Sequence, residues 1–289
     1  MAAPVIAAAV QMRSGIEPAR NVRDMAALVR EAAGRGASYV QTPEMTGALF
    51  RDREGLRKVL RSQADDPVAA AAQELASELR LWLHVGSTAI LREDGRVANR
   101  AFLFSPKGDL AATYDKIHMF DVDLDAGESW RESATYEPGR AGLVADLGRF
   151  RLGFSVCYDL RFPQLFRAEA LGGAEVLTVP AAFTRQTGEA HWHVLIRARA
   201  IENGAFVVAA AQGGRHEDGR ETFGHSMIVD PWGRIVAEAE GDEPGVILAE
   251  IDPAAVAAAR QKIPNLRNAR PFELETWPRS AGAEIKAAS

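Results

Sequence analysis

A single cysteine, Cys157, is the first candidate for chemistry in this chain. It stands in the segment Gly-Phe-Ser-Val-Cys-Tyr-Asp-Leu-Arg-Phe-Pro (153–163), where an apolar run leads into a turn and the closing proline can open a helix. A thiol at such a junction lies near backbone N–H groups and the positive end of a helix dipole, both of which favour the thiolate. The pattern is compatible with a nucleophilic cysteine, but position alone favours the more common role of a lone cysteine, a small buried apolar residue.

Two charged residues, Glu44 and Lys116, follow apolar runs in the same way as Cys157. Glu44 comes after a predicted strand over residues 37–41, and Lys116 comes after one over residues 110–114. Ligands of α/β folds bind beyond the carboxyl ends of the strands. If the strands before these three residues lie side by side and parallel, an acid, an amine and a thiol converge at one edge. Taken alone, either charged residue would usually be a solvated surface group.

The elements that must position these residues alternate along the chain, which predicts an α/β class with helices covering sheets. Strands are expected at 5–11, 37–41, 81–89, 99–104, 110–114, 151–156, 174–178, 206–211, 226–229, 234–238 and 247–251. Helices are expected at 19–34, 67–79, 163–171, 191–203 and 253–260. Turn signals at 106–109 and 230–233 add antiparallel hairpins. Residues 118–143 carry few such signals and are predicted to be a functional or mobile loop.

Composition excludes several classes of protein. The 289 residues carry a net charge of −5, which gives no electrostatic footprint for nucleic acid. One cysteine excludes an internal disulfide and a multi-cysteine metal site, and it fits a reducing compartment such as the cytoplasm. No apolar stretch approaches the ~20 residues that span a bilayer, so no membrane is expected. Without a linker or repeat, one domain over 1–289 is expected, with a core at about 4–252 and a tail at 253–289.

Three motifs in this chain resemble the signature blocks of the nitrilase superfamily of carbon–nitrogen hydrolases. They are Thr-Pro-Glu (42–44), Tyr-Asp-Lys-Ile-His (114–118) and the cysteine segment (153–163), in matching order and spacing. The resemblance covers nearly the whole chain and implies an α-β-β-α sandwich. It also implies a Cys-dependent enzyme without a metal or an organic cofactor.

The same resemblance assigns roles to the candidate residues. Glu44 corresponds to the general base, Lys116 to the oxyanion stabiliser and Cys157 to the nucleophile. Glu132 matches a second glutamate of related amidases, with Glu128 nearby as the alternative. If Lys116 is buried, its charge must survive there, so we expect Glu44 and Glu132 to flank it.

Within the superfamily the chain is similar to the Nit-type amidases, through segments 187–192, 197–203 and 223–226. Segment 209–216 is similar to the branch that acts on deaminated glutathione. This implies hydrolysis of the terminal amide of a small carboxylate-bearing substrate to acid and ammonia through a thioester. The alternatives are an ω-amidase acting on α-ketoglutaramate or succinamate, and a catalytically silent binding protein. Pairing through helices 163–171 and 191–203 implies a homodimer or larger homo-oligomer.

An anionic substrate requires cations near the pocket, and arginines in loops after strands are the candidates, although such arginines are often simply solvated. The candidate substrate-binding residues are Tyr158, Arg161, Arg185, His191, Trp192 and Arg215. The backbone N–H of Tyr158 is expected to bind the oxyanion together with Lys116. His191 and His193 stand two residues apart, which on a helix points them away from each other and makes a shared metal ion improbable.

Overall fold

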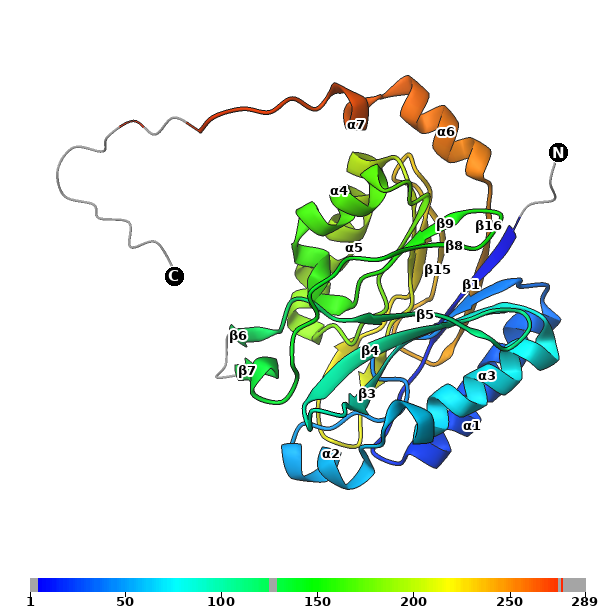
Figure 1. Cartoon of the computed structure of the whole chain (residues 1–289), viewed down its shortest axis with the longest axis vertical. Helices are drawn as coiled ribbons and strands as arrows, with labels where there is room; N and C mark the ends of the chain where they lie inside the picture. The colour runs from blue at the N-terminus through cyan, green and yellow to red at the C-terminus, as the bar shows by residue number, and fades with distance from the viewer. Residues whose placement is uncertain (1–4, 125–128, 275–276, 278–289) are drawn as a thin grey trace.

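The computed structural model of the chain describes residues 5–124, 129–274 and 277. Within these residues the strands form two six-stranded sheets and two short two-stranded ribbons. The two large sheets stack face to face, and helices cover their outer faces (Figure 1). The predicted α-β-β-α sandwich is confirmed. None of the described helices has both the length and the apolar character needed to cross a membrane.

The first sheet mixes parallel and antiparallel pairs. Its strands, in spatial order, are β16 (Gly245–Ile251), β1 (Val5–Gln11), β2 (Tyr39–Gln41), β3 (Trp82–Leu91), β4 (Val97–Phe104) and β5 (Leu110–Asp115). Strands β1, β2 and β3 run parallel, whereas β16, β4 and β5 join their neighbours antiparallel. Helices α1 (Pro18–Gly34) and α3 (Pro67–Leu79) pack on its outer face. Alternate residues of β1 therefore enter two cores, Ala8 and Val10 beneath these helices and Ala7 and Ala9 between the sheets.

The second sheet carries the cysteine segment. Its strands, in spatial order, are β15 (Ile235–Glu238), β14 (Met227–Val229), β11 (Phe206–Ala209), β10 (Val176–Thr178), β9 (Arg151–Gly153) and β8 (Val144–Asp146). Helices α4 (Pro163–Leu171) and α5 (Arg185–Asn203) cover its outer face, and α5 buries Trp192 and Ile196 completely. Helix α6 (Pro253–Lys262) follows β16 of the first sheet in the chain. It nevertheless contacts the second sheet, because Arg260 donates to the carbonyl of Ala174, just before β10.

The two sheets approach very closely at Gly86 of β3. A Cβ atom there would lie 2.2 Å from the carbonyl oxygen of Thr42 and 2.3 Å from the Cβ of Pro180, which follows β10 in the other sheet. Only glycine leaves room for this contact. The close approach places the loop after β2 against the loop after β10, and both loops reach the candidate site.

Several elements lie outside the sequence predictions. Segment 118–143, predicted as a loop, holds β6 (Asp121–Asp123), β7 (Ser129–Arg131) and the 3₁₀ turn Glu132–Ala134. The other additions are β8, α2 (Arg53–Val59), α7 (Asn265–Asn268), the ribbon of β12 (Gly213–Arg215) and β13 (Glu221–Phe223), and two 3₁₀ turns, Gln63–Asp65 and Cys157–Arg161.

Two predicted boundaries were wrong for physical reasons. Helix α5 begins at Arg185 rather than at His191, so that it runs through a glycine. Phe223 packs directly on that glycine, Gly188, where an added Cβ would lie 2.3 Å from the Cβ of Phe223. Strand β9 ends at Gly153 rather than at Val156, because the chain leaves the ladder there to form the cysteine turn.

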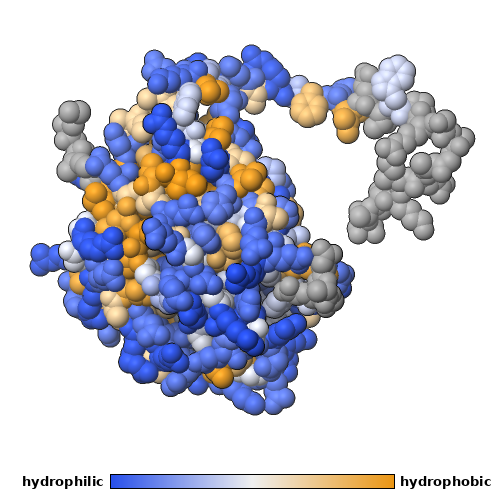
Figure 2. Space-filling model, turned by 180° about the vertical axis from the view of Figure 1, so that it is seen from behind, coloured by the Kyte–Doolittle hydropathy of each residue, from blue (hydrophilic) through white to orange (hydrophobic). Residues whose placement is uncertain are grey.

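Some large apolar side chains are exposed on the second sheet and on the helices that cover it. They include Leu171 of α4, Val194 and Ile201 of α5, and Ile235 and Val236 of β15. Figure 2, which views the molecule from behind, shows apolar residues gathered in one part of that face rather than scattered over it.

Candidate active site

The three residues predicted to converge do meet, but not through the arrangement that we expected. Glu44 follows β2 and Lys116 follows β5, two strands of the first sheet that run in the same direction but are separated by β3 and β4. Cys157 follows β9 in the second sheet. The premise of three neighbouring parallel strands was therefore wrong. The site forms instead where strand ends of the two stacked sheets face each other.

Lys116 is the centre of a buried charge cluster. Its Nζ donates to Oε1 of Glu44 at 2.9 Å and to Oε1 and Oε2 of Glu132 at 2.9 and 2.8 Å, with 2% of the side chain exposed. Burial alone would lower the pKa of Lys116, but the charges of Glu132 and Glu44 outweigh it and raise that pKa well above its ordinary value. The ammonium is therefore charged, flanked by both glutamates as predicted.

The pKa values of the two glutamates are shifted in opposite directions. Burial favours the neutral acid in both, yet the charge and hydrogen bond of Lys116 hold the pKa of Glu44 below its ordinary value. At Glu132, burial and the charge of Glu44 prevail and raise the pKa. Asn99 donates to Oε1 of both, at 2.9 Å to Glu44 and 3.2 Å to Glu132, and so fixes their spacing. Glu44 is thus an ionised carboxylate available as a base.

Cys157 occupies a sharp turn directly beside this base. Its φ of 50° lies in the left-handed region that a residue other than glycine rarely adopts, and its N–H donates to the carbonyl of Pro180 at 2.9 Å. The negative charge of Glu44 acts directly on the thiol. Burial, with the charge of Glu44, raises the pKa of Cys157 well above its ordinary value, and the opposing charge of Lys116 is too weak to reverse this. The predicted preference for the thiolate at rest was wrong, because the turn is buried and faces a carboxylate.

A second buried carboxylate, Asp159, fixes the cysteine turn, and sequence analysis missed it. Its Oδ2 accepts from the backbone N–H of Val156 at 2.9 Å and from the hydroxyl of Tyr114 at 2.7 Å. Its Oδ1 lies 2.7 Å from Nδ1 of His118 and accepts from the N–H of that residue at 3.0 Å. Tyr114 and His118 flank Lys116 in sequence, so Asp159 ties the lysine segment to the cysteine segment. The motif Cys-Tyr-Asp was the available signal.

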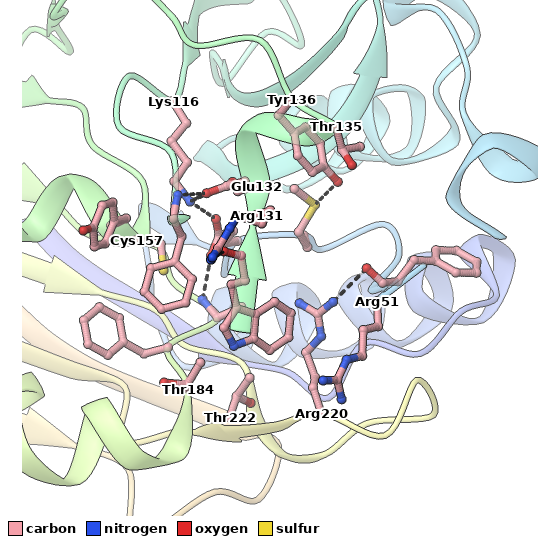
Figure 3. Close-up of a pocket in the computed structure, with 18 of the residues that line it drawn as sticks. Arg51, Lys116, Arg131, Glu132, Thr135, Tyr136, Cys157, Thr184, Arg220 and Thr222 are labelled. Carbon is pink, nitrogen blue, oxygen red and sulfur yellow. Dashed lines mark hydrogen bonds and ion pairs between the residues drawn. The ribbon is translucent and has the colours of Figure 1, made fainter. Parts of the chain in front are cut away.

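A cavity of about 370 Å³ opens onto Glu44, Lys116, Glu132 and Cys157 (Figure 3). Its volume falls within the range of small-molecule sites. Tyr158 lines it, as predicted for a substrate-binding residue. Its remaining wall combines aromatic side chains with cations: Phe50, Phe120, Trp130, Tyr136, Phe183, Arg51, Arg53, Arg131 and Arg220.

Two predicted contact residues lie behind the wall of this cavity. The guanidinium of Arg161 stacks 5.3 Å from the ring centre of Phe183 and lies 3.4 Å from Nδ1 of His191. Neither Arg161 nor His191 lines the cavity itself. Arg161 therefore contacts the wall residues Tyr158 and Phe183, and His191 contacts Arg161.

The other three predicted contact residues are also outside the cavity lining. Trp192 is fully buried, with its Nε1 donating to the carbonyl of His225 at 2.8 Å, because the inner face of α5 belongs to the core. Arg185 pairs with Glu189 at 3.2 Å on the surface, and Arg215 is an exposed residue of β12. Apart from Lys116, the cations that line the cavity were missed. The sequence signal for Arg51, Arg53 and Arg131 was their position, just after Glu44 or beside Glu132, and Arg220 had no such signal.

Glu128, the alternative second glutamate, lies outside the described residues. Among the described residues one group of three metal-capable side chains occurs, His193, His225 and Glu238, whose ligand atoms lie within 4.8 Å of one another. The imidazoles bond to Glu238 at 2.7 and 3.2 Å, and the group does not line the cavity. His191 and His193 bond to different partners, as their spacing predicted.

Curated relatives match almost the full length of this chain. A protein of Yersinia enterocolitica named deaminated glutathione amidase is 41% identical over 269 residues, which cover 91% of this chain and 92% of the relative. The human protein of the same name is 39% identical over 274 residues, covering 92% of this chain and 82% of the relative.

Solved structures agree with these relatives. The Caenorhabditis elegans NitFhit protein superposes with a TM-score of 0.84 and 33% identity, over 93% of this chain and 66% of that one. Saccharomyces cerevisiae Nit3, a member of branch 10 of the nitrilase superfamily, superposes with a TM-score of 0.81 and 29% sequence identity. The match covers 90% of this chain and 94% of that one. The family model described as carbon-nitrogen hydrolase matches residues 6–261. With its Glu, Lys and Cys gathered in one cavity, this chain belongs to the carbon–nitrogen hydrolase family.

Proposed function

We propose that this enzyme is a cysteine-dependent amidase that cleaves an amide of a small carboxylate-bearing substrate through a thioester on Cys157. One observation carries the proposal. A thiol, an ionised carboxylate and a charged ammonium line a single cavity. Nζ of Lys116 lies 2.9 Å from Glu44, and the charge of that same glutamate acts on the thiol.

The first half of the reaction forms the thioester. Glu44 takes the thiol proton as the sulfur of Cys157 attacks the amide carbon, and the carbonyl π electrons move onto oxygen. The ammonium of Lys116 and the backbone N–H of Tyr158 would bind this oxyanion. When the oxygen electrons return, the carbon–nitrogen bond breaks, and Glu44 gives its proton to the departing amine.

The second half of the reaction restores the enzyme. Glu44 takes a proton from water as that water attacks the thioester carbon, and the carbon–sulfur bond then breaks. The sulfur of Cys157 regains the proton, and the acid is released. Glu132 supports this cycle by bonding Lys116 with both of its carboxylate oxygens, which keeps the ammonium in place while Glu44 gains and loses its proton.

Deaminated glutathione is the substrate that the curated relatives favour. Glutathione contains no primary amide, so hydrolysis of the γ-amide in its deaminated form releases cysteinylglycine and α-ketoglutarate. Ammonia is the product only for simple amides such as α-ketoglutaramate, the substrate of the alternative ω-amidase activity. Both substrates donate the same acyl group to Cys157. They are distinguished only by the amine that leaves.

The test measures α-ketoglutarate released from deaminated glutathione and from α-ketoglutaramate by the wild-type enzyme, with Cys157→Ala as the control. We expect the higher kcat/KM for deaminated glutathione and no turnover by the variant. A higher kcat/KM for α-ketoglutaramate would favour the ω-amidase. No turnover of either substrate would support the catalytically silent binding protein instead.

We further propose that the enzyme forms a homodimer or larger homo-oligomer and acts in the cytoplasm. The exposed apolar residues Leu171 and Val194 lie on α4 and α5, the helices expected to pair. Light scattering on the wild type and on Val194→Glu checks the first proposal. A change of mass in the variant supports pairing through α5, and a monomeric wild type would contradict it.

A further inference from the structure

Two arginines meet on one aromatic ring at the side of the cavity away from Cys157. The guanidinium carbon of Arg51 lies 5.4 Å from the ring centre of Trp130, and that of Arg220 lies 4.9 Å from it. Figure 3 shows Arg51 and Arg220 close together and separated from Cys157 by the side chains of Arg131 and Glu132. The three residues come from three segments, before α2, in β7 and before β13, so the fold assembles this group.

The two arginines differ in what already holds them. Arg220 donates to Asp218 at 2.7 Å and to the carbonyl of Phe50 at 2.7 Å, and 16% of its side chain is exposed. Its charge is therefore matched and its position fixed. Arg51 is exposed and rests on Trp130, and within the part of the chain that the structure describes it forms no ion pair. Among the described residues, the pair thus carries one positive charge at the cavity wall without an ion-pair partner.

The neighbouring charges of the wall do not cancel it. Arg131 is engaged by Asp123 at 2.8 and 3.0 Å within the β6–β7 ribbon. Glu221, an acidic residue of the cavity wall, pairs with Arg185 at 3.9 Å rather than with Arg51. A fork-shaped guanidinium presents its N–H groups in one plane, which matches a carboxylate.

We propose that Arg51, supported by Trp130, binds the terminal carboxylate of the leaving group and so selects a peptide-like amine over ammonia. The proposal rests on the proposed function. The two candidate substrates share their acyl group, so the enzyme can distinguish them only on the leaving side. Cysteinylglycine adds two residues beyond the scissile nitrogen, at most ~7 Å of extended chain, and ends in a carboxylate. The leaving group is therefore longer than the acyl group, which fits a cation on the side of the cavity away from Cys157.

The experiment uses two substrates that differ by one charge, deaminated glutathione and its C-terminal amide. Wild type should show a kcat/KM about tenfold or more higher for the carboxylate form, the size of one charge-assisted hydrogen bond. Arg51→Ala should lose this preference, mainly through KM, so that its loss on the carboxylate form exceeds its loss on the amide form by about tenfold. Arg51→Lys should restore part of the preference. Arg57→Ala, an exposed arginine of α2 outside this cavity, is the matched control and should keep the wild-type ratio.

The outcomes separate this proposal from the one on which it rests. If wild type hydrolyses neither substrate, the proposed function fails and the assignment of Arg51 falls with it. If wild type prefers the carboxylate form and Arg51→Ala keeps the same ratio, the amidase stands and the assignment is overturned. Equal losses on both substrates would also overturn it, because they would place Arg51 on the acyl side or in the fold. Thermal melts confirm that each variant is folded.

Discussion

Replacing Lys116 with methionine should destabilise the protein strongly. The change removes the ammonium that donates to Glu44 and Glu132 at 2.8 to 2.9 Å and leaves two buried carboxyl groups facing each other. Breaking a buried ion pair by deleting one partner costs about 3–5 kcal/mol. For a chain of this length, that corresponds to a drop in melting temperature of roughly 6–20 °C at neutral pH.

The loss should depend on pH with a definite sign. Without Lys116, burial and mutual repulsion raise the pKa of Glu44 and Glu132 above the unfolded value of about 4.3. A carboxyl whose pKa is raised in the folded state supports the fold fully below the unfolded pKa, and that support is lost as the pH rises through the folded pKa. The melting temperatures of wild type and variant should therefore converge as the pH falls from 8 to 5.

Thermal unfolding followed by circular dichroism at pH 5, 6.5 and 8 provides the measurement. Lys107→Met, at an exposed turn, is the matched control and should melt like wild type. Adding Glu132→Gln to Lys116→Met should recover part of the lost stability, since one of the facing carboxyl groups is then gone. Wild-type melting of Lys116→Met at pH 8, or an equal loss at pH 5 and pH 8, would refute the charge cluster as we describe it.

The thiol, the sheet contact and the cysteine turn each lead to a further measurable outcome. Because burial and the charge of Glu44 raise the pKa of Cys157, the rate at which iodoacetamide labels the folded protein, followed by intact mass, should increase from pH 7 to 9. Glu44→Gln should move this increase to lower pH. A labelling rate that does not depend on pH would contradict the raised pKa. Gly86→Ala should lower the free energy of unfolding by at least about 1–3 kcal/mol in urea, whereas Gly34→Ala, with nothing within 4 Å of its added Cβ, should not destabilise. Asp159→Asn should reduce kcat roughly ten- to a hundredfold with little change in KM, because the turn loses its anchor; an unchanged kcat would show that the turn holds without it.

The family resemblance implied the sandwich, and the sequence predicted most of its strands because those strands are apolar runs bounded by turn residues. β1, α3 and α4 were predicted at their observed boundaries. The motifs around Glu44, Lys116 and Cys157 identified the residues that meet, and their order along the chain was informative even though the expected strand arrangement was wrong. Short motifs identify the residues that converge, but they do not show how the strands are ordered in the sheets.

The cavity wall was the part that the sequence could not predict. Its arginines lie in or just before a short helix and short ribbon strands, and these elements lack the apolar periodicity that reveals an element. Arg51 and Arg220 are 169 positions apart in the chain and meet only through Trp130. The ionisation of Cys157 was also beyond sequence reasoning, since it depends on how deeply the turn is buried.

The candidate site is joined across the two sheets by bonds between distant parts of the chain. Oε2 of Glu44 accepts from the backbone N–H of Ala182 at 2.9 Å, and Oε1 of Gln41 accepts from that of Ala210 at 2.9 Å. A half-assembled intermediate that has completed only one sheet would therefore hold a base without its nucleophile, or the reverse. During refolding, turnover should return only after both layers have docked, later than the recovery of secondary structure. The enzyme's own activity can thus report the last step of its assembly.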